Sequence, residues 1–285
     1  MRLYVVPRNE QVPVSRWNAW AGYSPQKAGL HFNQEDAAQF DSSISYIVGK
    51  ARELKRMNPQ VQPQFSLPFP GAGQLEAIVG GKHDATYRKA FEQMLAVFDP
   101  NSAGRIDVRI GWEQNFEVGF QKNSATNLAG AFDPPLYVEA YRHIVEIGRS
   151  ASPRFLYNWC PNHGLGSQTR PLSNYYPGDD VVDEIGFDFY MQARWGNPSL
   201  DWIVNSPYGA AWFRDFARVH GKPWCIPELG ADNDAAAPIL DQFMTWCAAN
   251  GCVWIGWYDR SEVINSEISA GALPAVGAVV RKYAR

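Results

Sequence analysis

The sequence predicts an α/β protein folded as a single (β/α)8 TIM barrel. Short apolar runs alternate with amphipathic helical stretches along most of the chain, and eight such strands fall within about 250 residues. An open doubly wound sheet would usually carry a Gly-rich phosphate loop after its first strand, and none is present. We therefore expect residues 1–285 to form one barrel domain, in which 1–60 fits the repeat least well.

Eight apolar segments are the predicted strands. The first two are LYVVP (3–7) and WNAWAGY (17–23), with no helix between them. The other six are VQPQFSLP (61–68), IDVRIGWE (106–113), FLYNWC (155–160), DEIGFDFY (183–190), KPWCIPE (222–228) and CVWIGWYD (252–259). Because strands that alternate with helices pair in parallel, their C-terminal ends meet at one end of the barrel.

Apolar residues three and four positions apart predict the helices. A long helix is expected to start with Asn33 as its cap and to run through Leu54. Asp133 and Pro134 are N-cap and first-turn signals for another helix, which Gly148 is expected to close. The remaining predicted helices are 84–98, a stretch ending at Gly221, 238–250 and 274–283.

Composition and charge exclude several classes of protein. The 26 basic and 29 acidic residues give a net charge of −3, which offers no electrostatic footprint for nucleic acid or an anionic membrane surface. No run approaches the roughly 20 apolar residues of a membrane span. The apolar run in MRLYVVPRNE is too short for a secretory signal, so the location stays open, with extracellular action expected if a signal was removed.

Several chemistry-bearing motifs are absent from the sequence. It contains no phosphate-binding GxGxxG or GxxxxGK loop, no GxSxG serine elbow and no HExxH zinc motif. Its four cysteines form no CxxC pair, and a disulfide between Cys247 and Cys252 is left open. We expect no metal and no cofactor.

Two glutamates end predicted strands, Glu113 on the fourth and Glu228 on the seventh. In a barrel these positions face each other across the mouth formed by the strand ends. Either glutamate alone is explained by helix capping or a salt bridge. Two carboxylates that converge on one cleft are what glycosidic bond cleavage requires, one to protonate the leaving oxygen and one to attack or to activate water.

Five segments of the chain resemble glycoside hydrolase family 26, a family of clan A retaining β-glycanases that includes mannanases and lichenases. The segments follow one another along the chain in the order expected for that family. RIGWEQN (109–115) resembles the acid/base strand of that family, and KPWCIPELG (222–230) resembles its nucleophile strand. The other three segments are similar to its sixth strand, its fifth strand and the segment before its third helix: YYPGDDVVDEIGFDFY (175–190), YNWCPN (157–162) and IVGGKHDATYRKAFEQM (78–94).

The resemblance implies a retaining double displacement with Glu113 as acid/base and Glu228 as nucleophile. It further implies that Tyr190 hydrogen-bonds the nucleophile and that Arg109 organises the carboxylates. The remaining implied substrate-binding or supporting residues are Asn115, Trp159 and Asn162 beside the cleft and Trp257 as an aromatic platform under the sugar. Many mannan-cleaving members carry His immediately before the acid/base, whereas this chain carries Trp112.

The 39 aromatic residues suit a glycan ligand, because sugar rings stack their apolar C–H faces on Trp and Tyr. Trp195 and Trp202 follow the sixth strand in a loop, and we expect about half of such loop tryptophans to contact sugar. Trp212 and Trp246, on helices, are expected to pack in the core. The resulting hypothesis is a monomeric endo-acting hydrolase of a neutral polysaccharide, with β-mannan, mixed-linkage β-glucan and β-1,3-xylan all open as substrates. The alternatives are a non-catalytic carbohydrate-binding barrel and an exo-acting clan A glycosidase.

Overall fold

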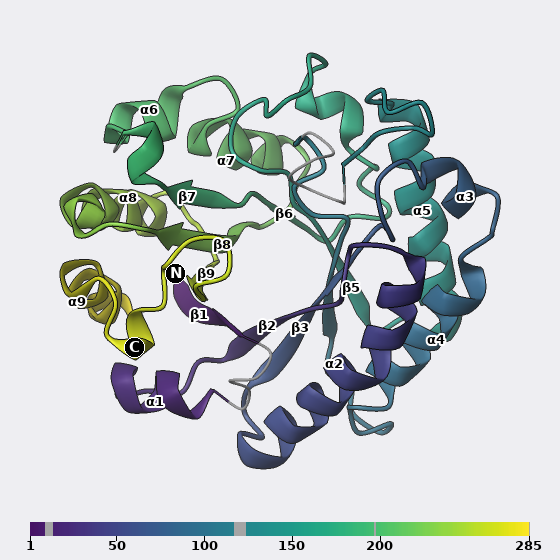
Figure 1. Ribbon diagram of the computed structural model, residues 1–285, viewed down its shortest axis with the longest axis horizontal. Coiled ribbons are helices and arrows are strands. Elements are labelled where there is room, and N and C mark those ends of the chain that lie inside the picture. The colour runs from purple at the N-terminus through teal and green to yellow at the C-terminus, as the bar shows by residue number, and fades with distance from the viewer. Residues whose placement is uncertain (9–13, 117–123, 197, 285) are drawn as a thin grey trace.

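The computed structural model describes residues 1–8, 14–116, 124–196 and 198–284 of the chain. At its centre, parallel strands form a closed barrel, and helices surround it on the outside (Figure 1). The strands follow one another in the order β6-β5-β4-β3-β2-β1-β9-β8-β7, and β6 also pairs with β8, which closes the ring. This closure confirms the predicted (β/α)8 barrel and excludes the open sheet.

The barrel strands all run in one direction. Their bounds are Arg2–Pro7 (β1), Lys27–His31 (β2), Gln62–Leu67 (β3), Ile106–Ile110 (β4), Phe155–Trp159 (β5), Glu184–Gly186 (β6), Phe189–Met191 (β7), Trp224–Ala231 (β8) and Trp254–Asp259 (β9). The sixth barrel strand is interrupted between β6 and β7, so β8 is the seventh and β9 the eighth. Because each pairing is parallel, the C-terminal ends of all strands lie at one end of the barrel.

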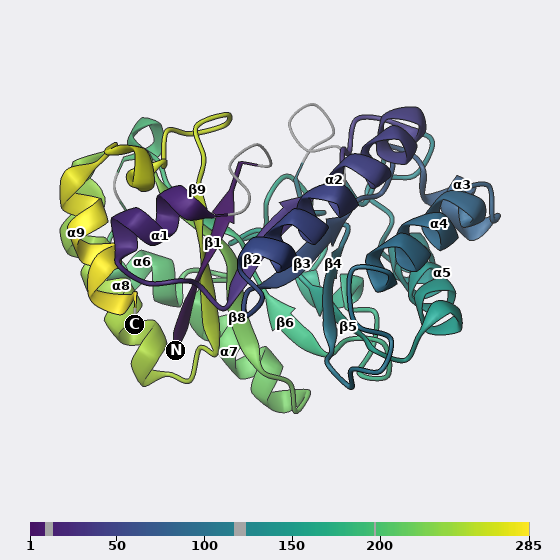
Figure 2. The same cartoon turned by 90° about the horizontal axis from the view of Figure 1, so that it is seen from below.

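Helices cover the outside of the barrel. Their bounds are Ser15–Ala21 (α1), Ala37–Met57 (α2), Leu75–Val79 (α3), Asp84–Leu95 (α4), Pro134–Ala151 (α5), Leu200–Asn205 (α6), Ala210–Val219 (α7), Ala237–Ala249 (α8) and Pro274–Tyr283 (α9). Figure 2 shows α1 and α9 together on one flank of the barrel and α3, α4 and α5 on the opposite flank. Within the described part of the chain, no helix is both long and apolar enough to cross a membrane.

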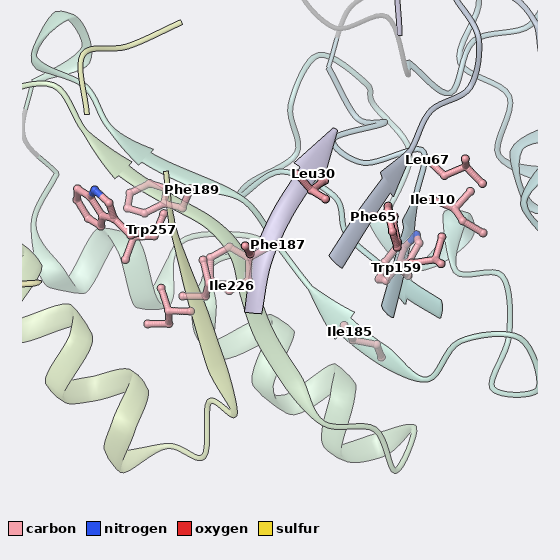
Figure 3. Packing of buried hydrophobic residues seen from close by; sticks show 14 of the residues in the cluster. Leu30, Phe65, Leu67, Ile110, Trp159, Ile185, Phe187, Phe189, Ile226 and Trp257 are labelled. Atoms are coloured by element: carbon pink, nitrogen blue, oxygen red, sulfur yellow. The ribbon is translucent and has the colours of Figure 1, made fainter. Parts of the chain in front are cut away.

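The main apolar core lies between the strands and the helices. Leu30, Phe65, Ile110, Ile185 and Ile226 belong to this one buried cluster, and each comes from a different strand (Figure 3). Successive side chains along a strand point to opposite faces. The residues that alternate with this cluster therefore face the barrel interior, and many of them are polar or charged.

Residues 17–23, predicted as the second strand, instead form most of α1 and the turn after it. Trp17 and Trp20 are three apart and their rings lie 5.1 Å from each other, which is helical spacing. The second strand is β2, KAGLH. The sequence reading missed it because it is short and contains Ala and Gly, which have little strand preference. Gly29 fits there because a Cβ would lie 3.1 Å from Val6 on β1.

The long helix α2 begins three residues later than predicted. Its N-cap is Asp36, whose carboxylate accepts a hydrogen bond from the backbone N–H of Gln39 at 2.8 Å. Asn33 lies in the preceding turn, where its side-chain oxygen accepts from the N–H of Glu35 at 2.8 Å. Asn and Asp both serve as caps, so a sequence with two candidates leaves the start of the helix undecided.

Helix α5 has the predicted start but not the predicted end. Asp133 caps it as expected, with its side chain accepting from the N–H of Leu136. Gly148 does not close the helix, which continues to its end at residue 151. A Cβ on Gly148 would lie 2.4 Å from the hydroxyl of Tyr157 and 2.7 Å from the ring of Phe91. This glycine therefore allows α5 to pack closely against its neighbours.

Candidate active site

A cavity of about 1300 Å³ opens at the C-terminal ends of the strands. Both predicted carboxylates line it, Glu113 from the loop after β4 and Glu228 from within β8. The other predicted site residues in its wall are Trp112, Asn162, Tyr190 and Trp195. The barrel therefore brings the two strand-end glutamates to one cavity, as the sequence pattern indicated.

Glu228 is almost fully buried and is surrounded by donors. Its Oε1 accepts from Arg109 and lies 2.8 Å from Nε2 of His31, while its Oε2 accepts from the hydroxyl of Tyr190. Burial alone would raise the pKa of Glu228, but the charge of Arg109 and the contact with His31 outweigh it and hold the pKa well below its ordinary value. Glu228 is therefore ionised over the working range of most enzymes.

Arg109 is the cation at the centre of this network, with 1% of its surface exposed. It lies on β4 and faces the barrel interior, where its Nη1 donates to Asp188 at 2.6 Å and its Nη2 donates to Glu228. Its Nε and Nη2 donate to the hydroxyl of Ser66 on β3, at 3.1 and 3.0 Å. Asp188 also accepts from the backbone N–H of Glu228 at 2.8 Å. One buried guanidinium thus connects four elements of the barrel.

Glu113 does not end β4 as predicted, because that strand stops at Ile110. Glu113 lies three residues further on, with a left-handed φ of 55° that non-glycine residues rarely adopt. Its backbone N–H donates to the carbonyl of Cys160 at 2.8 Å, and its carboxylate accepts from Asn162 Nδ2 at 2.8 Å. These bonds to the segment after β5 hold Glu113 in the cavity wall.

Asn115 and Asn162 form a pair behind Glu113. Asn115 is completely buried, donates to the carbonyls of Asn162 and Gly164, and accepts from the N–H of Asn162 at 2.8 Å. Asn115 therefore holds the loop that carries Asn162, and Asn162 reaches the carboxylate. Trp112 lies at the cavity wall with its ring beside His31, and the guanidinium of Arg109 lies 5.1 Å from its ring centre.

Trp159 and Trp257 do not line the described cavity, contrary to what the resemblance implied. Both are completely buried in the core between strands and helices (Figure 3). The ring of Trp159 contacts Phe216 of α7, and the indole of Trp257 donates to the carbonyl of Ser266 at 3.0 Å. On β9 the next residue, Tyr258, faces the cavity instead. A one-residue change along a strand moves a side chain to the other face.

The two loop tryptophans, Trp195 and Trp202, both lie at the cavity. Trp195 is 78% exposed and Trp202 is 50% exposed, and both contribute to the cavity lining. Trp212 and Trp246, predicted as core residues, are only partly buried and pack against the outside of the core. The distinction between exposed loop aromatics and packed helix aromatics therefore holds, although the helix tryptophans are less buried than expected.

Sequence reasoning missed four residues of the site: His31, Asp188, Tyr258 and Arg260. His31 was missed because it ends β2, a strand that the sequence pattern did not predict. A polar residue that ends a short apolar run, as His31 ends KAGLH, is the signal that could have found it. Asp188 lies between β6 and β7, inside the segment that resembles the sixth strand of the family.

No cluster of His, Cys, Asp and Glu that could hold a metal ion occurs among the described residues. All four cysteines are buried free thiols in the structure, Cys247 and Cys252 included.

Comparisons with known proteins come from sequence and from fold. No family model matches the chain. Over 165 residues it is 26% identical to a mannan endo-1,4-beta-mannosidase from Bifidobacterium adolescentis, a match that covers 56% of this chain and 16% of that protein. The chain therefore spans about one sixth of the length of this curated relative.

Solved structures match over nearly the whole chain. One of them is a modular endo-beta-1,4-mannanase from Cellulomonas fimi, whose structure is reported to explain the product specificity of glycoside hydrolase family 26 mannanases. Its TM-score to this chain is 0.68 at 19% sequence identity, and the match covers 95% of this chain and 65% of that chain. A GH26 beta-mannanase from Bacteroides ovatus has a TM-score of 0.59 at 12% identity, over 100% and 88% of the two chains. These comparisons confirm the resemblance to glycoside hydrolase family 26 that the motifs indicated, and the chain has the barrel fold of that family's mannanases.

Proposed function

We propose that this chain is a glycoside hydrolase, a retaining endo-β-glycanase in which residues 1–285 act as one catalytic domain. The observation that carries the proposal is the environment of Glu228. It is an ionised carboxylate held by Arg109 and Tyr190 in the wall of a cavity that it shares with Glu113. A fixed nucleophile opposite a second carboxyl group is the arrangement that double displacement needs.

In the first step, a lone pair of Glu228 attacks the anomeric carbon of the bound sugar. Glu113, protonated at this stage, donates its proton to the glycosidic oxygen as the bond from that oxygen to the anomeric carbon breaks. The leaving sugar departs as a neutral alcohol, and a glycosyl ester forms on Glu228. Asn162, which donates to Glu113, and Tyr190, which donates to Glu228, keep the two groups in position.

In the second step, Glu113 acts as a base and removes a proton from water. The water oxygen attacks the anomeric carbon, the ester bond breaks, and Glu228 returns as a carboxylate. Two inversions at one carbon give net retention of the β-configuration. For this geometry we expect the two carboxyl groups to lie about 5 to 5.5 Å apart.

We propose β-1,4-mannan as the first substrate to test, because the curated relative and the structural neighbours are named as mannanases. Mixed-linkage β-glucan and β-1,3-xylan are the other candidates. Trp112 stands where many mannan-cleaving members have His, and its indole replaces a polar ring beside the cavity. Single contacts of this kind change substrate preference by about 1 to 3 kcal/mol.

The test is release of reducing ends from β-mannan, mixed-linkage β-glucan and β-1,3-xylan by the wild-type protein. We expect hydrolysis of at least one glycan by internal cleavage, with a rapid fall in viscosity, and a β-anomer as the first product seen by proton NMR. A product released as a single short sugar from chain ends would indicate the exo-acting alternative. No hydrolysis of any glycan, with binding retained, would indicate the non-catalytic carbohydrate-binding barrel.

Azide rescue separates the roles of the two glutamates. With an activated aryl glycoside, Glu228→Ala should lose nearly all activity, and azide should restore turnover with an α-glycosyl azide as product. Glu113→Ala should accumulate the glycosyl enzyme, and azide should then give the β-glycosyl azide. A β-glycosyl azide from Glu228→Ala and an α-glycosyl azide from Glu113→Ala would contradict the assignment of nucleophile and acid/base. Glu76→Ala, on α3 outside the described lining of the cavity, is the matched control.

A further inference from the structure

His31 contacts three charged residues of the site, Glu228, Arg109 and Arg260, but the proposed reaction steps assign it no role. It is the last residue of β2, and its side chain is 13% exposed at the wall of the cavity. Its Nε2 lies 2.8 Å from Glu228 Oε1 and 2.8 Å from Arg109 Nη2. Its Nδ1 lies 3.2 Å from Nη1 of Arg260. Which ring nitrogen carries the proton decides what His31 can do for Glu228.

The contact with Arg260 favours one position of the proton on the His31 ring. A guanidinium group has only donors, so the ring nitrogen that faces Arg260 must be an acceptor. This contact favours a neutral His31 with its proton on Nε2, from which it can donate to Glu228. The opposite tautomer would set Nδ1–H against a guanidinium N–H and an Nε2 lone pair against a carboxylate lone pair.

Arg109 does not require His31 as an acceptor. The two hydrogens of its Nη2 have partners in the hydroxyl of Ser66, at 3.0 Å, and in Glu228. The short distance between Arg109 Nη2 and His31 Nε2 therefore reflects two donors that converge on one carboxylate oxygen. This arrangement is consistent with the Nε2–H tautomer.

Arg260 is itself held in place. Its Nε lies 3.2 Å from Oε2 of Glu262, and its guanidinium lies 5.5 Å from the ring centre of Tyr258. The titratable and charged groups around His31 and its partners are Arg109, Arg260, Glu228, Asp188, Tyr190, Tyr258 and Glu262. Burial lowers the pKa of His31 to about 4, the two arginines act in the same direction, and the carboxylate of Glu228 opposes them.

We propose that Arg260 is a positioning residue that holds His31 as the neutral Nε2–H tautomer, which donates a hydrogen bond to Glu228. Its catalytic consequence rests on the proposed function. A neutral donor orients the carboxylate for attack, whereas an imidazolium would add a second full charge beside Arg109 and weaken the nucleophile. Arg260 thus acts through His31, without touching the reacting carbon.

The direct test is a two-bond 1H–15N correlation spectrum of the imidazole groups in 15N-labelled protein, from about pH 5 to pH 8. His31 is assigned by its absence in His31→Gln. We expect the Nε2–H pattern in the wild type, with no titration in this range. In Arg260→Met we expect a mixture of tautomers or a titration within the range. Arg218→Met, an exposed arginine on α7, should leave the spectrum unchanged.

A wild-type His31 that carries its proton on Nδ1, or that titrates in this range, would overturn the proposal. An unchanged His31 spectrum in a folded Arg260→Met would do the same, and Arg260→Ala, which also removes the donor, serves if the Met variant does not fold. These readouts do not depend on turnover, so the tautomer can hold even if no glycan is cleaved.

If the proposed function holds, kcat/KM supplies a second readout. We expect His31→Leu to lower kcat/KM about ten- to a hundredfold, the usual effect of losing a hydrogen bond to a charged group. His31→Gln keeps an N–H near Glu228 and should recover part of that loss. Equal losses in the Leu and Gln variants would contradict the donor role.

Discussion

At the scale of single residues, the site depends on one buried cation shared by two buried carboxylates. Arg109 forms an ion pair with both Asp188 and Glu228, and each of the three residues is less than 4% exposed. Removing one member of such a group leaves an uncompensated charge away from water, which costs far more than a surface ion pair contributes. The same arginine therefore affects both folding stability and the ionisation of Glu228.

Arg109→Met should lower the free energy of unfolding by about 3 to 5 kcal/mol, since it leaves two carboxylates buried without their cation. It should also raise the pKa of Glu228. A nucleophile must be ionised, so the acid limb of the pH profile of kcat/KM should move to higher pH. Chemical denaturation and the pH profile check the two effects. Arg105→Met, an exposed residue just before β4, should change neither.

Trp195→Ala tests the aromatic rim of the cavity. The ring is 78% exposed, so its removal should leave the melting temperature unchanged. If sugar stacks on it, KM for a polysaccharide should rise about tenfold with little change in kcat, because the contact is made equally before and during reaction. Leu128→Ala, equally exposed at 78% and outside the described cavity lining, is the control. An unchanged KM would remove Trp195 from the binding surface.

At the scale of elements, the periodicity of apolar residues and the helix-capping residues predicted most strands and helices. These signals failed where tertiary packing overrides the local conformational preference of a segment. The segment KAGLH has little intrinsic strand tendency and becomes β2 because β1 and β3 pair with it on both sides. Gly148 has the sequence context of a helix end. It lies inside α5 because Tyr157 and Phe91 leave no room for a side chain.

Gly148→Ala and Gly49→Ala should have opposite effects, although both glycines lie in helices. At Gly148 a Cβ would overlap Tyr157 and Phe91, so we expect a loss of about 1 to 3 kcal/mol in unfolding free energy. At Gly49, on the exposed side of α2, a Cβ would meet nothing within 4 Å. There alanine should add about 0.5 to 1 kcal/mol through its better helix propensity. Urea denaturation measures both, and changes of the same sign would contradict this account.

At the scale of the whole molecule, the two ends of the barrel interior carry separate charged groups. The C-terminal end holds the site around Arg109. At the opposite end, Lys27 Nζ lies 2.8 Å from Asp107 Oδ2 and 4.8 Å from the ring centre of Trp254. Burial lowers the pKa of Lys27, but Asp107 and Glu184 outweigh it and hold the pKa above its ordinary value. In such barrels, this end serves stability rather than catalysis.

Lys27→Met should destabilise the fold by about 3 kcal/mol near pH 7 and leave KM unchanged. The contribution of Lys27 is present below its unfolded pKa and is lost only at strongly alkaline pH. In the variant, Asp107 and Glu184 face each other without a cation. Burial raises the pKa of Glu184, so the loss should shrink as pH falls and that carboxyl becomes protonated. Thermal melts near pH 7 and at a lower pH compare the stability of Lys27→Met with that of the wild type. Lys50→Met, a change in helix α2, is the control. A deficit independent of pH would contradict the electrostatic account.

The sequence by itself determined the repeat of strands and helices, and with it the barrel and the placement of Glu113 and Glu228 at one end. These features depend on local periodicity and on the rule that parallel strands end together. Only the tertiary structure decided which face Trp159 and Trp257 occupy, since a side chain changes face with every step along a strand. It also decided the partners of Glu228, because closure of the barrel is what brings His31 beside Glu228 and Arg260 beside His31.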